Sequence, residues 1–114
     1  MLVVKKFGGS SVADRERIFN VARRCIEDYN KGNDVVVVLS AMGKTTDGLI
    51  AKAHEITESP SRRELDMLLA TGEQVSVALM AMAIQSLGVQ AISLNAAQVP
   101  MKTTSAYGQA KLKR

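Results

Sequence analysis

The apolar positions of this chain form short continuous runs that alternate with segments of helical periodicity. The runs 2–4, 35–39 and 91–94 have the length and composition of buried strands. The run 35–39 is apolar at every position, so we expect both of its faces to be buried, as in the centre of a parallel sheet. The first helical repeat, which the segment 31–33 ends, contains Ile18, Ala22, Cys25, Ile26 and Tyr29.

Three more helices are expected between the second and third apolar runs. One covers about 47–57, and another covers 62–69 after a break at Pro60. The pair 72–73 is expected to separate this helix from a long one over 73–87. That last helix is apolar almost all round, which predicts deep burial.

Strands that alternate with helices predict an α/β protein with a mostly parallel sheet covered by helices on both faces. In such sheets, ligands bind at the carboxyl ends of the strands. Three segments then lie along one rim: the loop 6–11, the loop 40–47 and the start of the helix at Glu73. The sequence therefore predicts a ligand site at this rim.

The first rim segment combines a cation with a glycine turn that leads into a helix. It consists of Lys6, Phe7, Gly8, Gly9 and Ser10. Glycines let the backbone approach a bulky anion, and the free N–H groups of a helix N-terminus favour phosphate. The lysine would offset the negative charge of a transferred phosphoryl group. The segment thus suits a phosphate ligand.

The other two rim segments carry hydroxyls and a carboxylate. Ser40, Thr45 and Thr46 offer hydroxyl donors to a carboxylate or a phosphate. Glu73 follows a glycine at the head of the expected apolar helix, where the helix dipole favours its charge. This carboxylate would also bind an ammonium group of a ligand.

Each rim segment has a purely structural interpretation as well. Ser11, with Asp14 three residues later, has the form of a capping box at the start of the first helix. Thr46 or Asp47 would cap the next helix, and Glu73 would cap the last one. From the residues alone, ligand binding and capping remain open at every segment.

Three other motifs carry no chemistry. The segment 43–45 resembles the end of a P-loop, but the glycine that the pattern requires is replaced by Val38. His54 begins a zinc motif that lacks its second histidine, because Glu58 stands there. Cys25 lies on the apolar helix face and is interpreted as core packing. No metal ligand is assigned.

The composition argues against nucleic acid and membrane partners. The net charge is +4, but the arginines of the first helix are interspersed with acidic residues, as on a solvated face. Only two phenylalanines and two tyrosines are present, too few for base stacking. No uninterrupted apolar run approaches the roughly 20 residues that span a bilayer, and the N-terminus has no signal-peptide pattern. With a single cysteine, these features predict a cytoplasmic protein.

Taken together, the rim segments resemble the aspartate kinases of the amino-acid kinase family. The matching stretches follow one another in family order over nearly the whole chain: 6–12, 36–43 with 45–47, 64–69 with 71–73, and 103–104 with Gly108. The resemblance implies the three-layer sandwich of the carbamate-kinase-like fold, with residues 1–114 as the N-terminal part of the kinase domain. It also implies transfer of the γ-phosphoryl group of ATP to the β-carboxylate of L-aspartate, with Mg²⁺, on the route to lysine, threonine and methionine.

The resemblance also implies roles for individual residues. Lys6 is the expected catalytic residue. The ATP phosphates would be contacted by Lys6, Phe7, Gly8, Gly9 and Ser10. Aspartate would be held by Thr46 and Glu73 in a site that Ser40 lines.

The chain departs from the family pattern at its C-terminal side. The segment that grips adenine and ribose, the arginine for the substrate α-carboxylate and the ACT-type regulatory domains are all missing after Arg114. We therefore expect this chain alone to be inactive and the full-length protein to be a homo-oligomer. The alternatives are another amino-acid kinase, such as one for N-acetylglutamate, and a non-catalytic binding or assembly module.

Overall fold

The computed structural model describes residues 1–94 and the backbone of 109–113. A four-stranded sheet has the order β1-β2-β4-β3. Its strands are β1 (Leu2–Phe7), β2 (Asp34–Leu39), β3 (Gln90–Leu94) and β4 (Gln109–Lys113). Strands β1 and β2 are parallel, and β4 runs antiparallel to both β2 and β3. Three strands thus share one direction, which confirms the α/β class and the mostly parallel sheet.

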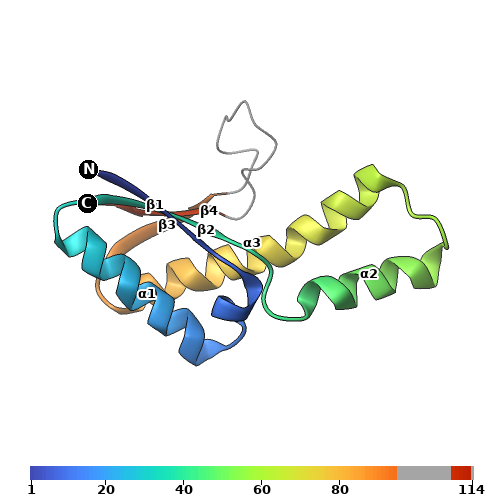
Figure 1. Ribbon diagram of the computed structural model, residues 1–114, viewed down its shortest axis with the longest axis horizontal. Coiled ribbons are helices and arrows are strands. Elements are labelled where there is room, and N and C mark those ends of the chain that lie inside the picture. The colour runs from blue at the N-terminus through green and yellow to red at the C-terminus, as the bar shows by residue number, and fades with distance from the viewer. Residues whose placement is uncertain (95–108, 114) are drawn as a thin grey trace.

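Three α-helices accompany the sheet (Figure 1): α1 (Arg15–Asn30), α2 (Thr45–Ile56) and α3 (Arg62–Ser86). Helix α1 connects β1 to β2 and packs beside the C-terminal half of α3 on one face of the sheet. The N-terminal half of α3 continues beyond the sheet and pairs with α2. The sheet with its helices and this α2–α3 hairpin form the two ends of the molecule.

The core lies between β2 and the two helices on its face. Alternate residues of β2 are fully buried there, namely Val35, Val37 and Leu39. They pack against buried residues of α1 and α3: Ile18, Val21, Ala22, Cys25, Val77, Met80, Ala83 and Ile84. This strand–helix contact fixes where the C-terminal end of β2 meets α3.

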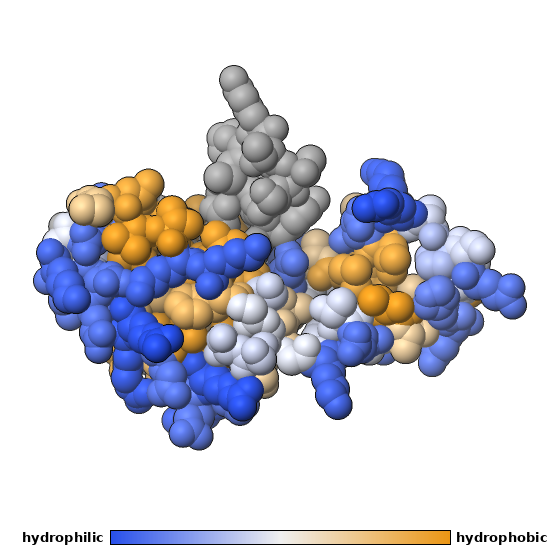
Figure 2. All heavy atoms as spheres, viewed as in Figure 1, coloured by the Kyte–Doolittle hydropathy of each residue, from blue (hydrophilic) through white to orange (hydrophobic). Residues whose placement is uncertain are grey.

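The opposite face of the sheet is open within the described residues. Val36 and Val38 are half-buried there, and Leu2 and Val4 of the edge strand β1 are 62% and 61% exposed. Figure 2 shows apolar side chains gathered at the end of the molecule that contains the sheet. The expectation that both faces of 35–39 are buried is therefore wrong for the part of the chain that the structure describes, because both packed helices lie on one side.

Helix α3 corrects a second expectation. It is one continuous helix of 25 residues, so the pair 72–73 separates nothing. An interior glycine costs a helix about 1 kcal/mol relative to alanine. Burial of α3 on both sides of Gly72, by α2 and by the sheet, outweighs that cost. The helix is also less enclosed than its composition predicts, since Val75 and Met82 are 52% and 60% exposed.

The start of α1 differs from the expected capping box. Residues Gly9–Val12 form a short 3₁₀ helix, η1, so Ser11 lies inside this turn and caps nothing. Asp14 is the cap instead, and its side chain accepts a hydrogen bond of 2.9 Å from the backbone N–H of Arg17. Aspartate is itself one of the preferred N-cap residues, which explains why Asp14 occupies this position.

By length and hydropathy alone, α3 would be able to cross a bilayer. Its buried side chains pack against β2 and α1 in the protein core, however. A core helix of a soluble protein passes the same length and hydropathy test, so this feature is weak evidence for a membrane span.

Two methionines on α3 test this packing. We predict that Met80→Ala destabilises the 114-residue chain by about 2–5 kcal/mol, because Met80 is fully buried and its loss leaves a cavity. Met82→Ala, at a 60% exposed position two residues away, should cost less than about 1 kcal/mol. Urea unfolding measures both. Equal losses from the two variants would contradict the described orientation of α3.

Candidate functional site

The first rim segment is a tight turn at the end of β1. Gly8 precedes η1, and its carbonyl accepts a hydrogen bond of 3.1 Å from the Ser11 N–H. The guanidinium of Arg17 on α1 donates to the Ser10 carbonyl at 2.8 Å and ties the turn to the helix. Lys6 is exposed at the strand end. The turn therefore has a hydrogen-bonded backbone and an exposed cation beside it.

The second rim segment is hydrogen-bonded to the first. The Ser40 N–H donates to the Phe7 carbonyl at 3.2 Å, and the Gly43 N–H donates to the Gly9 carbonyl at 3.0 Å. Gly43 has a φ of +46°, in the left-handed region where glycine is favoured. These bonds confirm that the loops after β1 and β2 lie side by side at the carboxyl ends of the strands.

A close approach accompanies these bonds. A Cβ added to Gly9 would lie 2.6 Å from the carbonyl oxygen of Ala41, closer than real Cβ atoms come to any neighbour. The backbone at Gly9 therefore leaves no room for a side chain. This requirement is specific, because a Cβ at the neighbouring Gly8 would meet no atom of the described residues within 4 Å.

Helices α2 and α3 complete the rim. Thr46 lies half-buried in the first turn of α2, just after a turn in which the Thr45 N–H donates to the Met42 carbonyl at 2.9 Å. Helix α3 meets the same loop at Gly72, where an added Cβ would lie 3.0 Å from the Cβ of Ala41. Glu73 comes next on α3. The structure thus brings all three rim segments to the same end of the sheet.

Glu73 is the most unusual titratable group of the rim. Its side chain is half-buried, and its Oε2 atom is buried with no hydrogen-bond partner among the described residues. Burial raises the pKa of this carboxyl, and the nearby charge of Lys6 partly offsets that rise. An unsatisfied buried carboxylate oxygen is costly and fits a site that a cationic ligand group completes.

The expected reason for the position of Glu73 is nevertheless wrong. The residue lies inside α3, well beyond the first turn that Ser61 caps, so the N-terminal helix dipole does not stabilise its charge. The structural interpretation, in which Glu73 caps a helix, is wrong for the same reason. The role of Glu73 toward a ligand stays a prediction.

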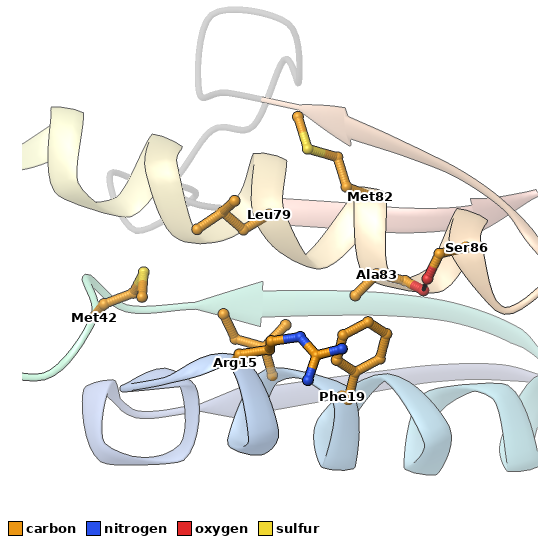
Figure 3. Close-up of a pocket in the computed structure, with 8 residues that line it drawn as sticks. Arg15, Phe19, Met42, Leu79, Met82, Ala83 and Ser86 are labelled. Carbon is orange, nitrogen blue, oxygen red and sulfur yellow. Dashed lines mark hydrogen bonds between the residues drawn. The ribbon is translucent and has the colours of Figure 1, made fainter.

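An apolar groove of about 490 Å³ lies elsewhere, between α1 and α3. Figure 3 shows Phe19 and Arg15 of α1 opposite Leu79 and Ala83 of α3, while the Met82 side chain points away from α1. The Arg15 guanidinium stacks 5.3 Å from the Phe19 ring centroid. None of the sequence-predicted site residues lines this groove. This groove therefore lies outside the predicted rim site.

The remaining titratable candidates keep their structural roles. His54 is exposed near the end of α2. Cys25 is buried, and burial raises its pKa to about 11, so the thiol stays protonated. Among the described residues, no group of three or more His, Cys, Asp or Glu side chains is placed to hold a metal ion.

Sequence reasoning missed two residues of the rim. Ala41 is buried between the turn at Gly9 and helix α3, and Gly72 allows the contact with that helix. Neither residue has a polar or reactive side chain, so a search for motifs of reactive side chains does not find them. The available signal was a glycine inside an apolar helical pattern, which indicates close packing.

Comparison with known proteins places this geometry in a family. The sequence pattern described as the amino acid kinase family matches residues 1–112. The aspartokinase of Geobacillus stearothermophilus is 54% identical over 111 residues, and that of Mycolicibacterium smegmatis is 56% identical over 111 residues. Each alignment covers 97% of this chain but only 27% and 26% of the relative, so the chain spans about a quarter of their length.

A solved structure agrees with the sequence comparison. The crystal structure of aspartate kinase from Synechocystis superposes with a TM-score of 0.84 at 55% identity. The superposition covers 87% of this chain and 17% of that one. The described fold is therefore found within a larger kinase.

The raised pKa of Glu73 predicts how the folding stability of the chain changes with pH. The pKa of Glu73 in the folded chain lies above the ordinary 4.5, so the unfolded chain loses this proton more readily. Folding stability therefore falls as the pH rises from the unfolded-state pKa through the folded-state pKa. Glu73→Gln should therefore stabilise the 114-residue chain at pH 7, and the gain should vanish below about pH 4. Thermal unfolding across this pH range measures it.

The matched control is Glu58→Gln, at an exposed position outside any helix. We expect no pH-dependent gain from it. A Glu73→Gln variant that is less stable than the parent at pH 7, or whose gain persists at pH 4, would contradict the described environment of Glu73.

Proposed function

We propose that this chain, which belongs to the amino acid kinase family, is the N-terminal part of an aspartate kinase. The reaction is transfer of the γ-phosphoryl group of ATP to the β-carboxylate of L-aspartate. The observation that carries this proposal is the meeting of a lysine turn, a hydroxyl loop and an unsatisfied buried carboxylate at one rim. The names of the relatives support the same reaction.

The turn after β1 is the phosphate side of the proposed site. The backbone of Gly8, Gly9 and Ser10 is held by the Ser11 and Arg17 hydrogen bonds, so it is ordered before a phosphate arrives. Lys6, which we propose as the catalytic residue, offsets negative charge as the β-carboxylate approaches the γ-phosphate. Phe7 anchors the turn by packing against the core.

The aspartate side consists of Glu73, Thr46 and Ser40. The buried oxygen of Glu73 gains its missing partner from the α-ammonium of aspartate. The hydroxyls of Thr46 and Ser40 donate to the carboxylates and orient them. A β-carboxylate oxygen then forms a bond to the γ-phosphorus, the bond from that phosphorus to the β–γ bridging oxygen breaks, and ADP leaves with the electron pair.

Mg²⁺ would arrive with the nucleotide and would help to neutralise the negative charge of its phosphates. The described part of the chain offers no cluster of carboxylates that would bind it independently. Adenine and ribose would be held by the part of the protein that corresponds to the rest of the relatives, of which this chain covers 27% or less. We therefore propose that residues 1–114 alone lack kinase activity.

Several features of the whole protein follow from the same proposal. We propose a cytoplasmic enzyme of lysine, threonine and methionine biosynthesis that carries ACT-type regulatory domains and assembles as a homo-oligomer. Its partners are L-aspartate and ATP, without nucleic acid or membrane. The alternatives are a kinase for another amino acid, such as N-acetylglutamate, and a non-catalytic binding module. An acylated substrate has no α-ammonium to complete Glu73, which favours aspartate over N-acetylglutamate.

A hydroxamate assay tests the proposed reaction. With ATP, Mg²⁺ and hydroxylamine, the full-length protein should form aspartyl hydroxamate from aspartate and none from N-acetylglutamate. Glu73→Gln should raise the KM for aspartate at least about tenfold, since an unpaired charge-assisted hydrogen bond costs roughly 1.5–3 kcal/mol. Lys6→Met should lower kcat about a hundredfold or more.

Lys5→Met is the matched control for Lys6→Met. Lys5 lies on the other side of β1 and pairs with Asp28 of α1, away from the rim. Its replacement should leave kcat within about threefold of the parent. No hydroxamate from the full-length protein, or equal kcat losses from both lysine variants, would contradict the proposed site.

A further inference from the structure

Ala41 is held between two glycines that belong to different elements. On one side, the Ala41 carbonyl oxygen lies 2.6 Å from where a Cβ of Gly9 would be. On the other side, the Ala41 Cβ lies 3.0 Å from where a Cβ of Gly72 would be. Ala41 itself is only 6% exposed. The phosphate turn, the loop after β2 and helix α3 therefore form a three-part stack without spare space.

Backbone conformation does not explain the glycine at position 72. Within residues 1–94 the glycines with positive φ are Gly32, Gly43 and Gly88, and Gly72 is not among them. Its position inside a helix costs about 1 kcal/mol relative to alanine. A Cβ added at Gly72 would also lie 3.4 Å from the Thr45 side chain and 3.5 Å from that of Leu49. This close packing is the reason that the structure offers for the glycine.

The carbonyl side of Gly72 is occupied as well. The buried hydroxyl of Ser76 donates to the Gly72 carbonyl at 3.4 Å, one turn along α3. This bond keeps the helix regular at Gly72, and the contact with the loop after β2 places this turn of α3. Glu73 follows directly on this fixed segment, so the place of its carboxylate depends on the Gly72–Ala41 contact.

We propose that Gly72 is a positioning residue for the amino-acid substrate. By lacking a side chain, it lets α3 lie against Ala41, and this contact sets the position of the Glu73 carboxylate relative to the Lys6 turn. The inference rests on the proposed function, because it concerns the ammonium site at Glu73. It adds a residue that contacts neither substrate and acts only through α3.

The test uses the full-length enzyme and compares three variants. Gly72→Ala should raise the KM for aspartate about tenfold or more while the KM for ATP changes less than about threefold, since α3 moves and the turn at Gly9 does not. The double variant Gly72→Ala with Ala41→Gly removes the 3.0 Å contact and should return the KM for aspartate to within about threefold of the parent. Gly48→Ala is the matched control.

Gly48 is also a helical glycine, in α2, but in the described part of the chain a Cβ there would meet nothing within 4 Å. Its replacement should leave both KM values unchanged. If Gly72→Ala prevents folding, Ala41→Ser enlarges the same contact from the loop side and should raise the KM for aspartate in the same direction.

Three results would overturn the inference. They are an unchanged KM for aspartate in Gly72→Ala, a failure of Ala41→Gly to rescue it, and an equal rise in both KM values. Glu73→Gln separates this failure from that of the proposed function. If Glu73→Gln raises the KM for aspartate and Gly72→Ala does not, only the positioning role fails. If neither variant raises it, the ammonium site at Glu73 fails too.

Discussion

The close packing of the loop after β2 against the turn after β1 is the constraint on which the rim depends. The Gly43 N–H bonds to the Gly9 carbonyl at 3.0 Å, and the Ala41 carbonyl leaves no room for a Cβ at Gly9. Parallel pairing of β1 with β2 brings the two loops to the same edge, but it does not set their separation. That separation comes from the glycine contact, and α3 is then placed against the same loop.

The energetic character of the rim follows from this arrangement. Most of the hydrophobic burial lies further along α3 and α1, around Met80 and Ile84. The rim instead contains a glycine inside a helix and a carboxylate oxygen that has no partner among the described residues, and both cost stability. Sites that bind charged ligands often carry such costs, because the groups that the ligand completes are unsatisfied without it. The core supplies the stability that offsets them.

Much of this could be predicted from the sequence. The apolar runs located β1, β2 and β3, and the family resemblance identified the rim residues that the fold brings together. The continuity of α3 could not be predicted, because a glycine disfavours a helix interior unless packing on both sides compensates. The open sheet face was also missed, since an apolar strand such as 35–39 does not reveal which neighbours cover it. The structure has Asp14 as the N-cap of α1. The sequence could not decide between Asp14 and Ser11, because both residue types are good N-caps.

The most direct test of the central claim is a crystal structure of the full-length protein with L-aspartate and a non-hydrolysable ATP analogue. The account predicts the α-ammonium within about 3.2 Å of a Glu73 carboxylate oxygen, and the γ-phosphate beside Lys6 and the backbone of Gly8 and Gly9. Aspartate bound away from Glu73, or a γ-phosphate away from the turn after β1, would contradict it.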